Sequence, residues 1–160
     1  MTSRRTVTAL TTLGLAAVLA VAGCGGDDGG VTVDPGNDTV KVETSDGTAV
    51  VTGGDDGTLP EGWPEEVALP EGGNVTGGVA VTTPGQEGWT AALEYPDTSA
   101  EDVAAALTSS LESAGFTSEG TVTTAEGSML VFKSSTYAVT AIVSAEGSGS
   151  TAAITVGREG

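Results

Sequence analysis

The chain contains no histidine and only one cysteine, Cys24, among its 160 residues. Without histidine it can build neither a Ser-His-Asp triad nor an imidazole metal site. A single cysteine excludes a disulfide within the chain and leaves no second thiolate to share a metal. Because the common catalytic centres each lack a part, we predict a protein that is not an enzyme and that has no cofactor and no defined metal centre.

Basic residues are also scarce. The chain has five Lys and Arg residues and 22 Asp and Glu residues, which gives a net charge of −17 at pH 7. This charge repels phosphates and anionic lipid headgroups, so we expect no nucleic-acid partner. The partners that such a surface favours are cationic, calcium-bearing or apolar. The simplest reading is that the acidity keeps a secreted protein soluble.

Two catalytic arrangements need no histidine. A serine–lysine pair could use Lys133 and Ser134, but both lie where a strand is expected to end. A pair of glycosidase carboxylates needs a deep cleft lined with aromatic rings, and only 4% of the residues are aromatic. Neither arrangement changes the prediction of a non-enzymatic protein.

The N-terminus has the pattern of a secretory signal. Arg4 and Arg5 precede an apolar stretch without charge, residues 6–22, and small residues follow it. The stretch is slightly shorter than the roughly 20 residues that cross a bilayer as a helix. We therefore predict a signal peptide over residues 1–23. The alternative is a signal anchor that contains an incidental cysteine.

Residues 21–24, Val-Ala-Gly-Cys, resemble the lipobox of bacterial lipoproteins. The resemblance implies that the thiol of Cys24 receives a diacylglyceryl group and that a peptidase cuts between Gly23 and Cys24. The protein would then be anchored by lipid to the cell membrane, at its extracytoplasmic face. The membrane is thus an expected partner, reached through Cys24.

Residues 24–58 are predicted to be an acidic, glycine-rich tether that is mostly disordered. They contain nine glycines and eight acidic residues but no aromatic residue, so they can bury little apolar surface. Within them, residues 39–43 and 48–52 flank a Ser-Asp-Gly turn in a hairpin-like pattern. An isolated hairpin is marginal in water, so this one would become ordered only by docking on the domain or on a partner.

Oxygen ligands in the same segment suggest weak calcium association. Extracellular calcium tolerates weak sites, although no stretch has the spacing of an EF-hand loop. The acidic and amide residues concerned are Asp27, Asp28, Asp34, Asn37, Asp38, Asp55 and Asp56.

Residues 59–160 are expected to form one globular domain of the α+β class. Alternating apolar residues predict strands at 75–82, 88–95, 129–133, 137–144 and 152–156, with a further short strand at 121–124 as an option. Between the second and third of these, a helix is expected. We predict a single antiparallel sheet of about five strands with one amphipathic helix packed on one face, in the order β-β-α-β-β-β.

The helix carries the clearest local signals. Thr98 and Glu101 have the spacing of a capping box, which makes Thr98 the expected N-cap. Val103, Leu107 and Leu111 recur every four residues and form an apolar stripe. Gly115 is expected to end the helix in a left-handed conformation.

The two tryptophans are candidates for ligand contact. Trp63 and Trp89 each lie beside a glycine, and an exposed indole could hold a glycan or a peptide. The competing interpretation is core packing, because a domain with six aromatic residues usually needs both indoles inside.

The arrangement as a whole resembles small secreted lipoproteins of high-GC Gram-positive bacteria that have no assigned function. The matching features are the lipobox, the acidic tether, the proline-containing stretch 59–70, and residues 106–116 before a β-meander. The resemblance implies a fold and a cellular location but no substrate. We expect a binding or scaffolding module of the cell envelope, with an envelope protein or a glycan as partner. The alternative is a carrier of a small apolar ligand or lipid, with a cavity facing Val103, Leu107 and Leu111.

The lipid anchor predicts the effect of replacing its cysteine. Cys24→Ser should release the protein from the membrane into the medium, because no thiol remains to be acylated. Cell fractionation followed by immunoblotting measures the distribution. Membrane retention of Cys24→Ser equal to that of the native chain would contradict lipidation at this residue.

Overall fold

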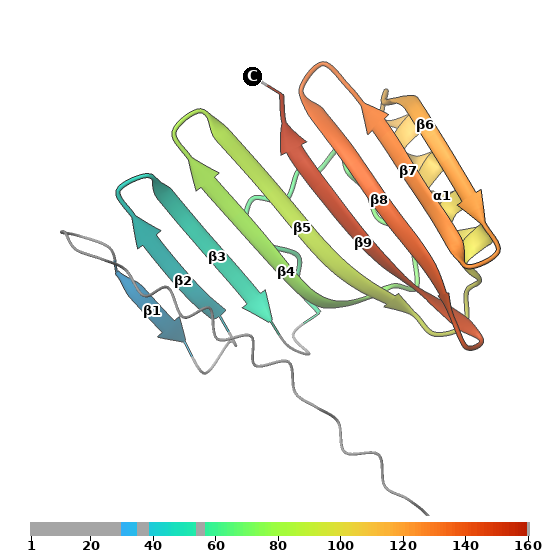
Figure 1. Ribbon diagram of the computed structural model, residues 1–160, viewed down its shortest axis with the longest axis horizontal. Helices are drawn as coiled ribbons and strands as arrows, with labels where there is room; N and C mark the ends of the chain where they lie inside the picture. The colour runs from blue at the N-terminus through green and yellow to red at the C-terminus, as the bar shows by residue number, and fades with distance from the viewer. Residues whose placement is uncertain (1–29, 35–38, 54–56, 160) are drawn as a thin grey trace, which may run out of the picture.

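The structure, a computed structural model, describes residues 30–34, 39–53 and 57–159. They form one antiparallel sheet with the strand order β1-β2-β3-β4-β5-β9-β8-β7-β6, and a single helix lies against one face of it (Figure 1). The elements are β1 (Val31–Asp34), β2 (Thr39–Thr44), β3 (Gly47–Gly53), β4 (Asn74–Thr83), β5 (Gln86–Tyr95), α1 (Ala100–Ser113), β6 (Thr117–Thr124), β7 (Gly127–Lys133), β8 (Tyr137–Glu146) and β9 (Gly149–Arg158).

The prediction of about five strands is wrong, because the described residues form nine. Three of the additional strands lie in the segment expected to be a tether. The hairpin of β2 and β3 docks on the edge of β4, with Thr48 paired to Thr82 and Val50 to Ala80. Backbone pairing to an edge that already exists orders a segment whose side chains alone could not build a core.

The fourth additional strand is β6, which starts earlier than the short strand that the sequence offered as an option. Residues 117–120 join it through a bulge between Ser118 and Gly120. All eight of its residues are exposed, and β6 forms one edge of the sheet. Its threonines and serine lack the apolar alternation that marks a half-buried strand.

The chain order explains why the helix crosses the sheet. After β5, α1 runs behind the sheet to β6 at its edge, and β6 to β9 then return as a meander (Figure 1). The last strand, β9, pairs with β5 from Gly88 and Gly157 to Tyr95 and Ser150. The helix therefore lies over the C-terminal half of the sheet, against β7, β8, β9 and β6.

The N-terminus of the helix differs from the prediction by one residue. Ser99, not Thr98, is the N-cap, and its Oγ accepts from the backbone N–H of Asp102 at 3.2 Å. The same hydroxyl donates to the Asp102 carboxylate at 2.7 Å. Thr98 instead closes the preceding turn, donating its N–H to the carbonyl of Tyr95. Serine is the better N-cap of the two, whereas the spacing of a capping box to a glutamate favoured Thr98, so the two local signals pointed to different registers.

The C-terminus of the helix follows the prediction. Gly115 has φ +87°, and its N–H donates to the carbonyl of Glu112. The N–H of Phe116 donates to the carbonyl of Leu111 at 2.9 Å, which completes a Schellman motif. The ring of Phe116 is buried, so it closes the end of the core.

The core lies between α1 and the inner face of β5, β9, β8 and β7. Alternate residues of these strands are buried, as the period of a strand requires. The largest fully buried side chains are Tyr95, Phe132, Leu107, Leu111, Leu130, Ile154, Val67, Val103, Val139, Val143 and Val156.

Residues 57–73 cover the same face beside the helix, across β4 and β5 (Figure 1). The ring of Pro60 lies directly on Gly78 of β4. Val67 is fully buried, and Tyr95 donates its hydroxyl proton to the carbonyl of Pro70 at 3.4 Å. Burial raises the pKa of Tyr95. The sheet thus has one covered face, shared by the helix and this proline-containing segment.

The contact between Pro60 and Gly78 predicts the effect of adding one methyl group. A Cβ at position 78 would lie 2.8 Å from Cδ of Pro60, so Gly78→Ala must displace the segment from the sheet. We expect a loss of about 1–3 kcal/mol in the free energy of unfolding, measured by urea denaturation. Gly157→Ala is the matched control, because a Cβ at that strand position meets no atom within 4 Å. Equal stability of the two variants would contradict the packing described.

Candidate functional site

A groove lies between the N-terminal half of α1 and the hairpin of β6 and β7. Its volume is about 650 Å³, within the range of small-molecule pockets. Small side chains form most of its wall. From the helix these include Ala100, Ala104, Ala105 and Thr108, and from the hairpin Thr121, Thr123, Ala125 and Ser128.

The register of the hairpin explains why this space is open. Thr121 pairs with Leu130 and Thr123 with Ser128, so both threonines face the helix. Opposite them the helix presents Ala104, a side chain equally short. The short side chains of the helix and of the hairpin do not reach each other, and the space between them is the groove. Leu130 forms its floor.

Some of the polar groups in the groove are hydrogen-bonded to other groups of the protein. Thr108 donates its hydroxyl proton to the carbonyl of Ala104 at 2.9 Å, as an internal helical bond. Ser128 donates to Thr123 Oγ1 at 3.2 Å. Glu101 is the one charged residue in the lining. The groove therefore offers methyl groups interspersed with hydroxyl groups, and a carboxylate at the end nearest the helix N-terminus.

The groove is not where the sequence placed a cavity. Val103, Leu107 and Leu111, which were expected to face it, are 1%, 0% and 0% exposed and fill the core. The groove follows the neighbouring stripe of the helix, at Ala100 and Ala104. The sequence contains the alanines, but nothing in it indicates that β6 would place threonines opposite them.

Both tryptophans have their indole N–H groups occupied inside the protein. Trp89 is 9% exposed and donates to the carbonyl of Glu61 at 3.1 Å. Its ring meets Tyr137 edge to face, with centroids 6.2 Å apart. Trp63 is partly buried and donates to the carbonyl of Val67 at 2.9 Å. Both residues hold the segment 57–73 on the sheet, and neither contributes to the groove.

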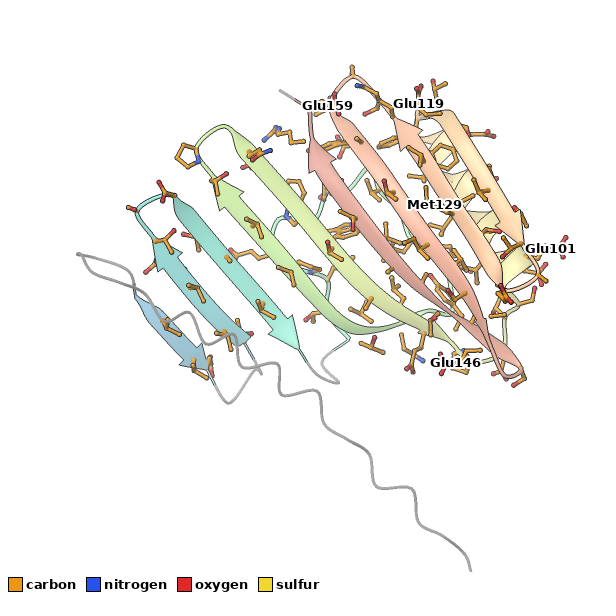
Figure 2. The ribbon with its side chains drawn as sticks, viewed as in Figure 1. Glu101, Glu119, Met129, Glu146 and Glu159 are labelled. Carbon is orange, nitrogen blue, oxygen red and sulfur yellow. The ribbon has the colours of Figure 1, made fainter. Side chains whose placement is uncertain are left out.

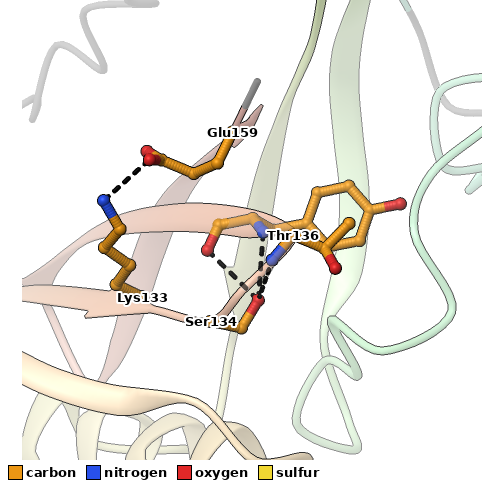
Figure 3. A network of polar contacts seen from close by, with 5 residues as sticks. Lys133, Ser134, Thr136 and Glu159 are labelled. Carbon is orange, nitrogen blue, oxygen red and sulfur yellow. Dashed lines mark hydrogen bonds and ion pairs between the residues drawn. The ribbon is translucent and has the colours of Figure 1, made fainter.

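The residues of the serine–lysine alternative are both engaged with other groups (Figure 3). Lys133 Nζ lies 2.7 Å from a carboxylate oxygen of Glu159, and this hydrogen bond raises the pKa of the lysine above its usual range. Ser134 Oγ accepts from the backbone N–H groups of Thr136 and Tyr137 at 3.2 and 3.0 Å. The serine thus stabilises the β7–β8 turn, and the adjacent lysine is held by Glu159.

The other cations of the described residues are also paired. Arg158 forms an ion pair with Glu87, which raises the pKa of the guanidinium, and it lies 6.0 Å from the ring centroid of Tyr137. Lys41 lies 3.0 Å from Glu43. These pairs are exposed, so their contribution to stability is small.

Several predicted site residues lie outside the described part of the chain. These are Gly23, Cys24 and all the acidic and amide residues considered for calcium except Asp34. Across residues 30–34, 39–53 and 57–159, no group of three potential metal ligands comes together. Within the same ranges, no helix has the length and apolar character needed to span a membrane.

The chain matches no protein-family model, no curated protein and no solved structure. The functional argument therefore depends on the residues and geometry described above.

Proposed function

We propose that the protein is a lipid-anchored lipoprotein of the extracytoplasmic membrane face that acts as a non-enzymatic binding or scaffolding module. The observation that carries the proposal is the sequence Val-Ala-Gly-Cys at 21–24, directly after a short apolar stretch with two arginines before it. It resembles the signal of small secreted lipoproteins of high-GC Gram-positive bacteria. Cys24 is the acylated residue in this proposal, and the domain is what the anchor holds at the membrane.

The non-enzymatic part of the proposal is supported by the engagement of the candidate catalytic groups. Lys133 and Arg158 form ion pairs, and the hydroxyl of Ser134 is hydrogen-bonded to backbone. The partner in this proposal is an envelope protein or a glycan, with weak calcium association through the acidic residues that give the chain its net charge of −17.

The mass of the mature protein tests the anchor directly. We expect intact-mass analysis of protein purified from membranes to give a chain that begins at Cys24 and carries a diacylglyceryl group. Cys24→Ser provides the control, since it removes the acceptor thiol and should give an unmodified mass. A native chain that retains residues 1–23, or that begins at Cys24 without added mass, would contradict the proposal.

A second candidate function, transport of a small apolar ligand, is favoured by the groove. Its volume of about 650 Å³ and its lining of alanine and threonine methyl groups, interspersed with hydroxyls, suit a neutral and largely apolar small molecule. Glu101 at one end would favour a ligand without negative charge there.

Filling the groove tests this second function. Ala105 is exposed in the groove wall, so Ala105→Phe should occupy the space and weaken binding of the neutral dye Nile red by about tenfold or more. Fluorescence titration measures the affinity. Ser113→Phe, exposed in the last turn of the same helix and away from the groove, is the matched control. Equal dye binding by the native chain and Ala105→Phe would contradict a ligand site in the groove.

A further inference from the structure

The face of the sheet opposite the helix carries an uncharged row that crosses all nine strands. Residues paired directly across an antiparallel sheet point to the same side, so the register identifies the members of this row. They are Val33, Val40, Val51, Val79, Thr90, Thr155, Thr140, Val131 and Gly120. The adjacent row through β6, β7, β8, β9 and β5 is also apolar, with Val122, Met129, Ile142, Ala153 and Ala92.

These side chains are exposed to an unusual degree. Ile142 is 51% exposed, Val122 59% and Val33 60%. Seven of the eight large apolar side chains that are exposed in the described ranges lie on this face, with Leu59 as the exception. Large exposed apolar patches mark interaction sites on soluble proteins, so this concentration of apolar side chains on one face favours a partner surface there.

The charged residues of this face lie near the ends of its strands. Lys133 and Glu159 form their ion pair at one end, and Glu146 lies at the other, while Met129 lies between these ends on β7 (Figure 2). The large negative charge of the chain is thus kept away from the centre of the face. A second negatively charged molecule could approach this centre without burying a carboxylate.

The chemistry of the face favours a protein sheet over a membrane or a glycan. Surfaces that lie on membranes use tryptophan, lysine and arginine, and glycan sites use aromatic rings. Trp89 lies on the opposite face of the sheet, and Trp63 is packed against that core. Two threonines of the row also pair with each other, since the hydroxyls of Thr90 and Thr155 are 3.2 Å apart and hydrogen-bonded. This bond uses one of the two hydroxyl protons, so burial of the pair would leave one donor to be met by the partner surface.

The size of the face suits a stable dimer. Nine strands about 4.8 Å apart, rising about 3.3 Å per residue, give a face of roughly 1,000 Å². A standard interface buries about 800 Å² on each partner. Sheets of valine and threonine pack face to face about 10 Å apart in β-sandwiches.

From these observations we propose that the protein forms a dimer in which the exposed sheet faces of two copies pack together as a sandwich. The interface is isologous, so each copy supplies the same rows of residues. The helix and the groove then lie on the two outer surfaces and stay accessible. This proposal does not depend on the lipid anchor or on a ligand.

Sedimentation of the chain 24–160 with Cys24→Ser, which contains every described residue, tests the dimer. We expect a concentration-dependent dimer whose dissociation constant rises about tenfold or more in Ile142→Lys, because the variant buries a charge within the face, midway along β8. Lysine also reduces the net negative charge, so weaker association cannot come from increased long-range repulsion. Ser109→Lys, exposed on the helix, is the matched control and should dimerise as the native chain does.

Several outcomes would overturn the proposal. They are a native chain that stays monomeric at its highest soluble concentration, a folded Ile142→Lys that dimerises equally well, and a monomer that binds phosphatidylcholine vesicles through this face. Circular dichroism checks that each variant is folded. Val79→Lys, in the long row, replaces Ile142→Lys if the latter does not fold, and the same loss of dimer is expected.

Discussion

The pairing of β5 with β9 is the contact on which the rest of the structure depends. It joins the β1–β5 meander to the β6–β9 meander through eight residue pairs, from Gly88 and Gly157 to Tyr95 and Ser150. Since β9 must return to the middle of the sheet, α1 has to cross behind it to reach the far edge. The core is continuous across this junction, because Ala91 and Ile154 are paired and fully buried.

One helix cannot cover nine strands. The parts of the sheet that it leaves uncovered are the surfaces available for function. The segment 57–73 extends the cover over β4 and β5, where Gly78 lets the ring of Pro60 approach the sheet. At the other edge, the short side chains of β6 and of the helix leave the groove beside Ala104. The opposite face has no cover among the described residues, and its valines and Ile142 stay exposed. Both candidate binding surfaces therefore arise from incomplete coverage of a single sheet.

The sequence predicted the helix and strands that have a periodic apolar pattern of their own. It missed the strands that form only because they pair with a neighbouring strand. Periodic apolar residues identified five of the strands, and the stripe of Val103, Leu107 and Leu111 identified the helix, because each pattern reports burial on one side. β2 and β3 have little to bury, so only the edge of β4 makes them strands. The groove could not be predicted either, since it results from the register that sets Thr121 and Thr123 against the helix.

The sequence by itself determined the absence of histidine chemistry, the strong negative charge, the helix with its glycine stop at Gly115, and the expected lipid attachment at Cys24. These follow from composition or from contacts between residues close in the chain. Only the tertiary structure decided the number of strands, the place of the groove and the alignment of valines and threonines into one row across the sheet. Each of these requires pairing between segments distant in sequence, and local propensity carries no information about which strand edges will meet.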